Sequence, residues 1–87
     1  MSCGTETTAA FDRAAMTDKL NALTDEDKYG IVLRAKGILC NAAGEWFQFD
    51  YVPGESQFRP GSADYTGRIC VIGVGIDIPA IKGMFGL

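Results

Sequence analysis

The sequence predicts an α+β domain, a two-layer sandwich in which helices pack on one face of a mostly antiparallel, four-stranded sheet. Residues 31–40 and 68–74 are apolar runs rich in β-branched residues, and residues 46–52 alternate between apolar and polar. Residues 13–23 and 78–85 show the apolar spacing of helices. Because helical segments lie near both ends and strands lie between them, the helices and the sheet should form separate layers.

The expected order of elements is strand, helix, strand, strand, an optional short strand, strand and helix. The first strand of this order is assigned to residues 6–11 and is expected to lie at an edge of the sheet. Asp12 is a suitable N-cap for the helix over 13–23, because its carboxylate accepts a hydrogen bond from the first turn. The apolar stripe of this helix consists of Met16, Leu20 and Leu23. Residues 24–27 offer a cap and an acidic first turn for one more short helical turn, which Gly30 ends.

The predicted central strand is residues 31–40, with the sequence IVLRAKGILC. Side chains of a strand alternate between its two faces. Strict alternation places Ile31, Leu33, Ala35, Gly37 and Leu39 on one face. It places Val32, Arg34, Lys36, Ile38 and Cys40 on the other. Two cations on an otherwise apolar strand are a local anomaly, so Arg34 and Lys36 are candidate interaction residues.

A hairpin should join this strand to residues 46–52, because residues 41–44 have the composition of a turn. Antiparallel pairing would make Asp50 available as a carboxylate for Arg34 or Lys36. One interpretation of these cations is therefore structural, with their stems lying along the sheet and their charges paired with Asp50 or another carboxylate. The other is that they meet an acidic partner or an anion.

The middle of the chain is rich in aromatic residues: Trp46, Phe47, Phe49, Tyr51, Phe58 and Tyr65. About half of them should be core, and the others could cover a neighbouring domain, because aromatic residues are enriched at interface cores. Trp46 is the expected exposed member, since it is the first strand residue after a turn. Trp46 and Asp50 join Arg34 and Lys36 as candidate interaction residues.

The C-terminal part should contain one further strand and a helix. Residues 55–59 are either a short strand or an extended loop, and residues 68–74 form a buried strand. Asp77 is the expected N-cap of the final helix, 78–85.

Composition narrows the function classes. The chain has 87 residues and a net charge of −3, from 11 acidic and 8 basic residues, which argues against a nucleic-acid partner. It contains no histidine, and its three cysteines show no C-x-x-C spacing, so we expect no metal site, no catalytic residue with a histidine base and no disulfide framework. We expect a cytoplasmic protein without a membrane partner, because no signal peptide or membrane-spanning run is present.

Three stretches together carry a family resemblance: Leu33–Gly37 (LRAKG), Glu45–Gly54 (EWFQFDYVPG) and Thr66–Gly73 (TGRICVIG). In this order, they resemble the C-terminal domain of the CobW family, the GTP-binding proteins linked to cobalamin synthesis and metal insertion and regarded as metal chaperones. The resemblance spans about residues 6–85, and it implies that residues 1–87 are a single domain from a longer GTPase. The polar beginning and apolar end of the chain fit a module of a longer protein.

The resemblance also implies a role without catalysis. In this family an N-terminal P-loop GTPase domain binds and hydrolyses the nucleotide, and none of its motifs occurs here. The resemblance therefore implies an accessory domain that is not an enzyme and binds no cofactor. GTP, Mg²⁺ and a transition metal are expected only in the GTPase domain. The implied partners are that GTPase domain and a client metalloprotein.

Two alternatives remain open at this point. The chain could be a small ligand-binding or enzymatic domain with a carboxylate or basic pocket, which would require strongly shifted pKa values in a deep cavity. It could also be a self-associating structural module, a homo-oligomer that pairs through an exposed strand edge.

Overall fold

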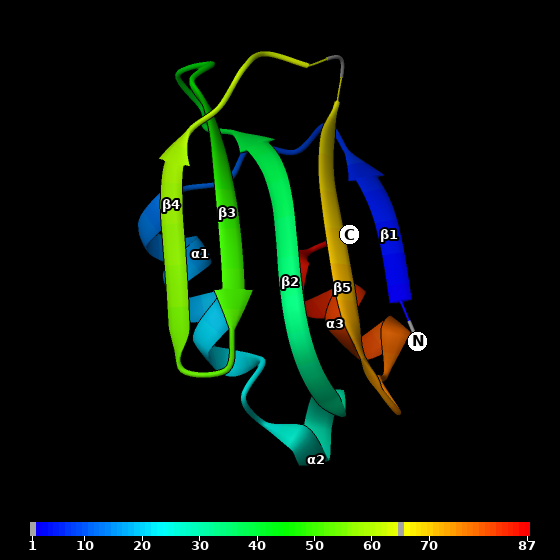
Figure 1. Cartoon of the computed structure of the whole chain (residues 1–87). Coiled ribbons are helices and arrows are strands. Elements are labelled where there is room, and N and C mark those ends of the chain that lie inside the picture. Colours follow the sequence, from blue (N-terminus) through cyan, green and yellow to red (C-terminus); the bar gives the residue numbers. More distant parts are fainter. Residues whose placement is uncertain (1, 65) are drawn as a thin grey trace.

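The computed structural model describes residues 2–64 and 66–87 and shows a five-stranded antiparallel sheet with helices on one face (Figure 1). The strands are β1 (Ser2–Thr7), β2 (Ile31–Cys40), β3 (Trp46–Val52), β4 (Glu55–Pro60) and β5 (Gly67–Val74). The helices are α1 (Arg13–Ala22), α2 (Glu26–Tyr29) and α3 (Ile78–Phe85). The strands lie in the order β1-β5-β2-β3-β4, so β2 is central. Tyr65, one of the aromatic residues noted in the sequence, lies outside the described residues.

This architecture confirms the predicted α+β fold and differs in its strand count and order. Both segments that the sequence left weakest are strands, so the sheet has five strands rather than four. The N-terminal strand covers Ser2–Thr7 instead of residues 6–11, and it pairs antiparallel with β5. β4 pairs with β3 across the tight turn at residues 53–54. Both strands lie at sheet edges, where only one side of the backbone is hydrogen-bonded to another strand. Their side chains therefore carry only a weak strand pattern in the sequence.

Each helix begins at an aspartate. The carboxylates of Asp12, Asp25 and Asp77 accept hydrogen bonds from backbone N–H groups of the first turns of α1, α2 and α3. The Lys19 ammonium of α1 donates to the Met84 carbonyl of α3 at 2.8 Å, which joins the two helices near the end of α3. In the described part of the chain, no helix is long and apolar enough to cross a membrane.

The core lies between the sheet and the helices. From the sheet it includes Leu39, Phe47, Phe49, Tyr51, Ile69 and Val71, and from the helices it includes Met16, Leu20, Ile81 and Phe85. Phe47, Phe49 and Tyr51 share one face of β3, as the alternation predicted. The opposite face of the sheet, which is toward the viewer in Figure 1, carries no described helix. We call it the open face.

A β-bulge in β2 makes the predicted alternation of this strand wrong at its beginning. Val32 pairs with Gly73 of β5, whereas Arg34 pairs with the preceding β5 residue, Ile72, so Leu33 is an extra residue. Because one residue is inserted, the side chains before the bulge change faces relative to those after it. Val32 is therefore buried with Ala35 and Leu39, and Leu33 is 50% exposed.

Tyr51 carries an unusual buried hydroxyl group. Its side chain is 1% exposed, and within the described residues its hydroxyl oxygen has no hydrogen-bond partner. Burial raises the pKa of the Tyr51 phenol, because the phenolate loses more solvation than the neutral group. The unfolded chain therefore ionises at this position first, and stability falls as the pH rises through the ordinary tyrosine pKa of about 10.

We expect Tyr51→Phe to raise the free energy of unfolding at neutral pH by up to about 1 kcal/mol, because an unpaired buried hydroxyl is removed and the ring is kept. Urea unfolding at neutral pH and at a pH above 10 measures both effects. The advantage of the variant should grow at the higher pH, and a loss of stability at both pH values would contradict this account of Tyr51.

Candidate functional site

The open face contains a groove of about 860 Å³, and the groove lies open to solvent rather than enclosed. Its floor crosses the three central strands and reaches β1. Small residues make the hollow: Gly4 of β1 faces Cys70 of β5, and a side-chain carbon added at Gly4 would meet nothing within 4 Å. Longer side chains line it, among them Lys36, Asp50 and Arg59.

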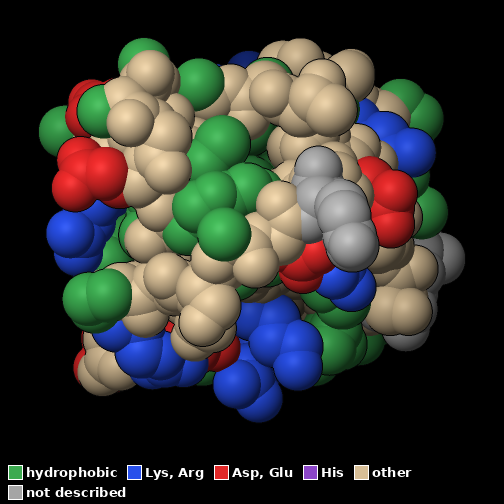
Figure 2. Space-filling view, turned by 90° about the horizontal axis from the view of Figure 1, so that it is seen from above, with side chains coloured by type: hydrophobic (Ala, Val, Ile, Leu, Met, Phe, Trp, Pro, Cys, Tyr) green, Lys and Arg blue, Asp and Glu red, His purple; other side chains and the backbone are tan. Residues whose placement is uncertain are grey.

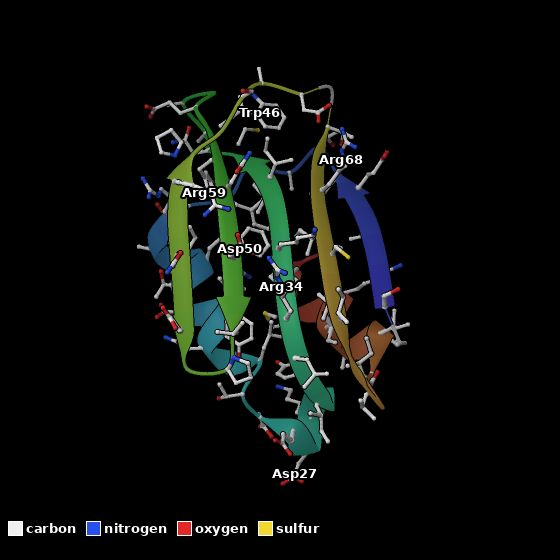
Figure 3. The ribbon with its side chains drawn as sticks, viewed as in Figure 1. Asp27, Arg34, Trp46, Asp50, Arg59 and Arg68 are labelled. Carbon is white, nitrogen blue, oxygen red and sulfur yellow. The ribbon has the colours of Figure 1, made fainter. Side chains whose placement is uncertain are left out.

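Two arginines hold Asp50 in the groove. Arg34 Nη2 lies 3.0 Å from Asp50 Oδ1, and Arg59 Nη2 lies 2.7 Å from Asp50 Oδ2. The sheet register explains this geometry, because Asp50 is directly opposite Lys36 on β2 and Gln57 on β4. The two arginines are each two residues from those positions, at the diagonal distance that long side chains span. Figure 3 shows Arg34, Asp50 and Arg59 converging from three neighbouring strands.

Hydrogen bonds from Arg34, and then from Arg59, lower the pKa of Asp50, and this effect outweighs the opposing effect of partial burial. The carboxylate therefore stays ionised at neutral pH and offers both oxygens to the arginines. A group in this state neither donates a proton nor accepts one readily, so Asp50 is poorly suited to acid–base catalysis.

Lys36 is the third cation beside Asp50. Within the described residues its ammonium makes no ion pair or hydrogen bond, although its Cα lies directly opposite that of Asp50. We call Arg34, Lys36 and Arg59 the cation cluster. Lys and Arg side chains gather along the lower edge of Figure 2, which looks along the strands from above. The three cations of the cluster surround a single carboxylate, so the cluster has an excess of positive charge.

Exposed apolar side chains lie beside the cation cluster, where β2 begins and where β3 and β5 end. They are Ile31 (44% exposed), Leu33 (50%), Val52 (44%), Ile72 (39%) and Val74 (59%). We call these five residues the apolar patch. Ile31 is directly opposite Val74, and Arg34 is directly opposite Ile72, so the patch adjoins the cluster. Single exposed apolar residues are ordinary, but a group of them on one sheet face marks a candidate contact surface.

The structure brings three of the four predicted interaction residues together. Arg34, Lys36 and Asp50 lie together on the open face. Trp46 is on the same face of β3 but at its other end, opposite Cys40, and it is half-buried rather than exposed as predicted (Figure 3). Their role in an interaction stays a prediction. Arg59 was not among the predicted residues, because residues 55–59 fitted either a short strand or an extended loop and so gave Arg59 no defined face. The two-residue turn at 53–54 was the available signal, since it sets the register of the hairpin.

A third ion pair, between Arg68 of β5 and Asp64, lies on the β1 side of the groove. Glu6 of β1 is directly opposite Arg68. Figure 3 shows Asp27 in α2, at the lower end of the domain and well away from the groove. No group of His, Cys, Asp or Glu within residues 2–64 and 66–87 is arranged to hold a metal ion.

The family of this chain follows from a sequence match. The profile of the family described as "Cobalamin synthesis protein cobW C-terminal domain" matches residues 2–86. The chain belongs to the CobW C-terminal domain family. This CobW C-terminal domain is thus a domain of the kind found in CobW-like GTPases, as the resemblance of its three sequence blocks implied.

Solved structures of a CobW-family GTPase have the same fold. The crystal structure of Zn(II)-bound YjiA GTPase from E. coli matches with a TM-score of 0.73 and 21% identity, over 98% of this chain. The Zn(II)-bound triple mutant of YjiA GTPase matches with a TM-score of 0.74 and 20% identity, also over 98%. In both cases the match covers 28% of the YjiA chain, so this CobW C-terminal domain corresponds to less than a third of that protein. A search of curated proteins found no match.

Replacing Asp50 with asparagine should cost less than about 1 kcal/mol of stability at neutral pH, because both arginines are more than half exposed and exposed ion pairs contribute little. Since the pKa of Asp50 is lowered below its ordinary value of 3.8, the pair stabilises the fold above that pH and is lost as the pH falls below it. Urea unfolding should therefore give a small deficit for Asp50→Asn at pH 7. If that deficit persisted unchanged in strong acid, its cause would not be the charge of Asp50.

Proposed function

We propose that this chain is a non-catalytic accessory domain of a CobW-like GTP-binding protein and that its open face binds the GTPase domain of the same parent chain. The observation that carries the proposal is the apolar patch beside the cation cluster on a sheet face without a described helix. Domains built on a sheet bury its apolar surface against another layer. The five residues of the apolar patch remain 39–59% exposed in this chain, so a further layer has apolar surface to cover.

The state of Asp50 supports a role without catalysis. Both of its oxygens are bound by arginines, and its pKa is lowered. A catalytic acid or base works best with a pKa near the working pH, and Asp50 is shifted away from it. The groove is also open, whereas sites for small molecules usually enclose most of the ligand surface.

The nucleotide and the metal belong to the rest of the parent protein in this proposal. GTP, Mg²⁺ and a transition metal would be bound by the GTPase domain. The accessory domain would either transmit the nucleotide state of the GTPase domain to a client metalloprotein or stabilise the GTPase domain. A cytoplasmic location follows from that assignment. The client metalloprotein is the second partner in the proposal. The alternative is a homo-oligomer, and the binding experiment must distinguish self-association from binding to the GTPase domain.

The test is GTP hydrolysis by the parent protein with and without this domain. The parent is compared with a fragment that lacks residues corresponding to 2–86, and the 87-residue chain is then added back in trans. We expect the hydrolysis rate or the nucleotide affinity of the fragment to change and the added chain to restore it. Isothermal titration calorimetry of the two pieces measures their association directly.

A pair of variants assigns the contact to the open face. Leu33→Ser removes an exposed apolar residue of the patch, and Leu87→Ser makes the same change at the C-terminus, where the side chain is 38% exposed. Only Leu33→Ser should weaken association. Equal binding by both variants, or a lack of association of the unaltered pieces, would overturn the proposal, and light scattering would show self-association if the chain pairs with itself.

A further inference from the structure

From the charges on the open face we infer that its partner is an amphipathic protein segment whose apolar stripe is flanked by acidic side chains. The inference rests on the proposed function, because it specifies the chemistry of the surface that the open face would bind. In this arrangement the apolar stripe covers the apolar patch, and a carboxylate of the partner approaches Lys36 between Arg34 and Arg59.

The local charge carries the first step of the argument. The chain as a whole has a net charge of −3, yet the three cations of the cluster surround the carboxylate of Asp50, an excess of two positive charges before Glu55 at the edge of the cluster is counted. Asp50 already accepts hydrogen bonds from both arginines, at 3.0 and 2.7 Å. In the described residues Lys36 has no such partner. An acidic group brought to Lys36 would therefore gain an attraction that the isolated domain does not already satisfy.

Two other acidic residues of the open face are separated from the cluster, and a third, Glu55, lies at its edge. Glu6 and Asp64 lie on the β1 side of the groove, near Arg68. Glu55, at the turn between β3 and β4, is directly opposite Val52 of the apolar patch and lines a small hollow with Arg34 and Asp50. It accepts a hydrogen bond from the neutral amide of Gln57 at 3.3 Å and keeps its negative charge, so the local excess is one positive charge. The positive excess is thus concentrated over β2, β3 and β4, directly beside the apolar patch.

The arrangement fits a protein segment better than other occupants. An open groove encloses too little of a small anion or metabolite to bind it strongly, and apolar residues on its flank would add nothing to such binding. A second copy of this chain in a two-fold dimer would place the same patch against itself, and wherever the two clusters faced each other their like charges would repel. An amphipathic helix laid on the sheet satisfies both the apolar patch and the cluster.

The experiment uses the intact chain and two probes. One probe is the GTPase fragment of the parent, and the other is a model helical peptide with a leucine stripe flanked by glutamates, compared with a twin that carries lysines in their place. Binding is measured by fluorescence anisotropy at low and high salt. The key variant is Lys36→Glu, and its matched control is Lys28→Glu, the same change at an exposed position on α2.

We expect the glutamate peptide to bind and the lysine peptide to bind at least about tenfold more weakly. Lys36→Glu should lose about tenfold in affinity for both the glutamate peptide and the GTPase fragment, Lys28→Glu should lose none, and high salt should reduce the difference. Circular dichroism confirms that both variants are folded, which is expected because both positions are exposed.

Each other outcome decides between the two proposals. If the GTPase fragment binds but Lys36→Glu and Lys28→Glu behave alike, the acidic partner is overturned and the proposed function stands. If the glutamate peptide binds and the fragment does not, the partner chemistry stands and the partner is another protein. If inorganic phosphate shifts the NMR signals of the cation cluster and neither peptide binds, the site is a small-anion site and the inference is wrong.

Discussion

Gly30→Ala is expected to destabilise the domain by about 3 kcal/mol or more, the largest effect of any single-methyl addition proposed for this chain. Gly30 has φ +82° and ψ −170°, a combination that is essentially confined to glycine. A side-chain carbon here would also lie 2.7 Å from Ile76 Cα and 2.8 Å from the Gly75 carbonyl carbon. Neither backbone atom can move easily, because Asp77 N–H donates to the Tyr29 carbonyl at 3.0 Å and holds the two segments together.

Gly44→Ala is the matched control, since it separates backbone strain from steric conflict. Gly44 also has φ +82°, but an added carbon would meet nothing within 4 Å. We expect Gly44→Ala to cost roughly 1–2 kcal/mol from the left-handed conformation alone. Urea unfolding of both variants gives the difference, and equal losses would show that the contact with residues 75–76 relaxes at no cost.

The second large effect should come from Leu39→Ala in the central strand, with a loss of about 2–5 kcal/mol. Leu39 is fully buried (0% exposed) against the helices. Leu33 lies in the same strand and is 50% exposed because of the bulge, so Leu33→Ala should cost less than about 1 kcal/mol. The same leucine-to-alanine substitution thus compares the loss of stability on the buried face and on the exposed face of one strand.

This pair also tests the bulge. Without the inserted residue, strict alternation would put Leu33 and Leu39 on the same buried face, and both substitutions would be costly. Unfolding of the two variants in urea, under two-state conditions, discriminates between these cases. A loss above 2 kcal/mol for Leu33→Ala would contradict the register of β2 and β5 that the structure shows.

The regular elements could be predicted because their signals are local. Asp12 and Asp77 cap the helices they were expected to cap, and the strands at 31–40 and 46–52 begin and end as predicted. The bulge could not be predicted, since no glycine or proline marks Leu33 and its cause is the pairing with a strand more than thirty residues away. The position of β1 was missed for a related reason: small polar residues at a sheet edge leave no alternation to detect.

The candidate site was predictable in part. Arg34, Lys36 and Asp50 were expected to share a face because they lie in adjacent strands of one hairpin, and they do. Arg59 depended on a third strand that the sequence only weakly indicated. The apolar patch was harder to predict from the sequence. Leu33 is exposed only because of the bulge, whereas strict alternation would place it in the core with Ala35 and Leu39.

The order of the strands has a consequence for how the chain acquires its structure. β2, β3 and β4 follow one another directly, so this meander can form from a short, continuous piece of chain soon after it is synthesised. β1 pairs with β5 alone, and β5 begins only at Gly67. β1 precedes the rest of this domain in the chain and must therefore wait, unpaired, until β5 has been synthesised, so closure of the sheet is a late, non-local step of folding.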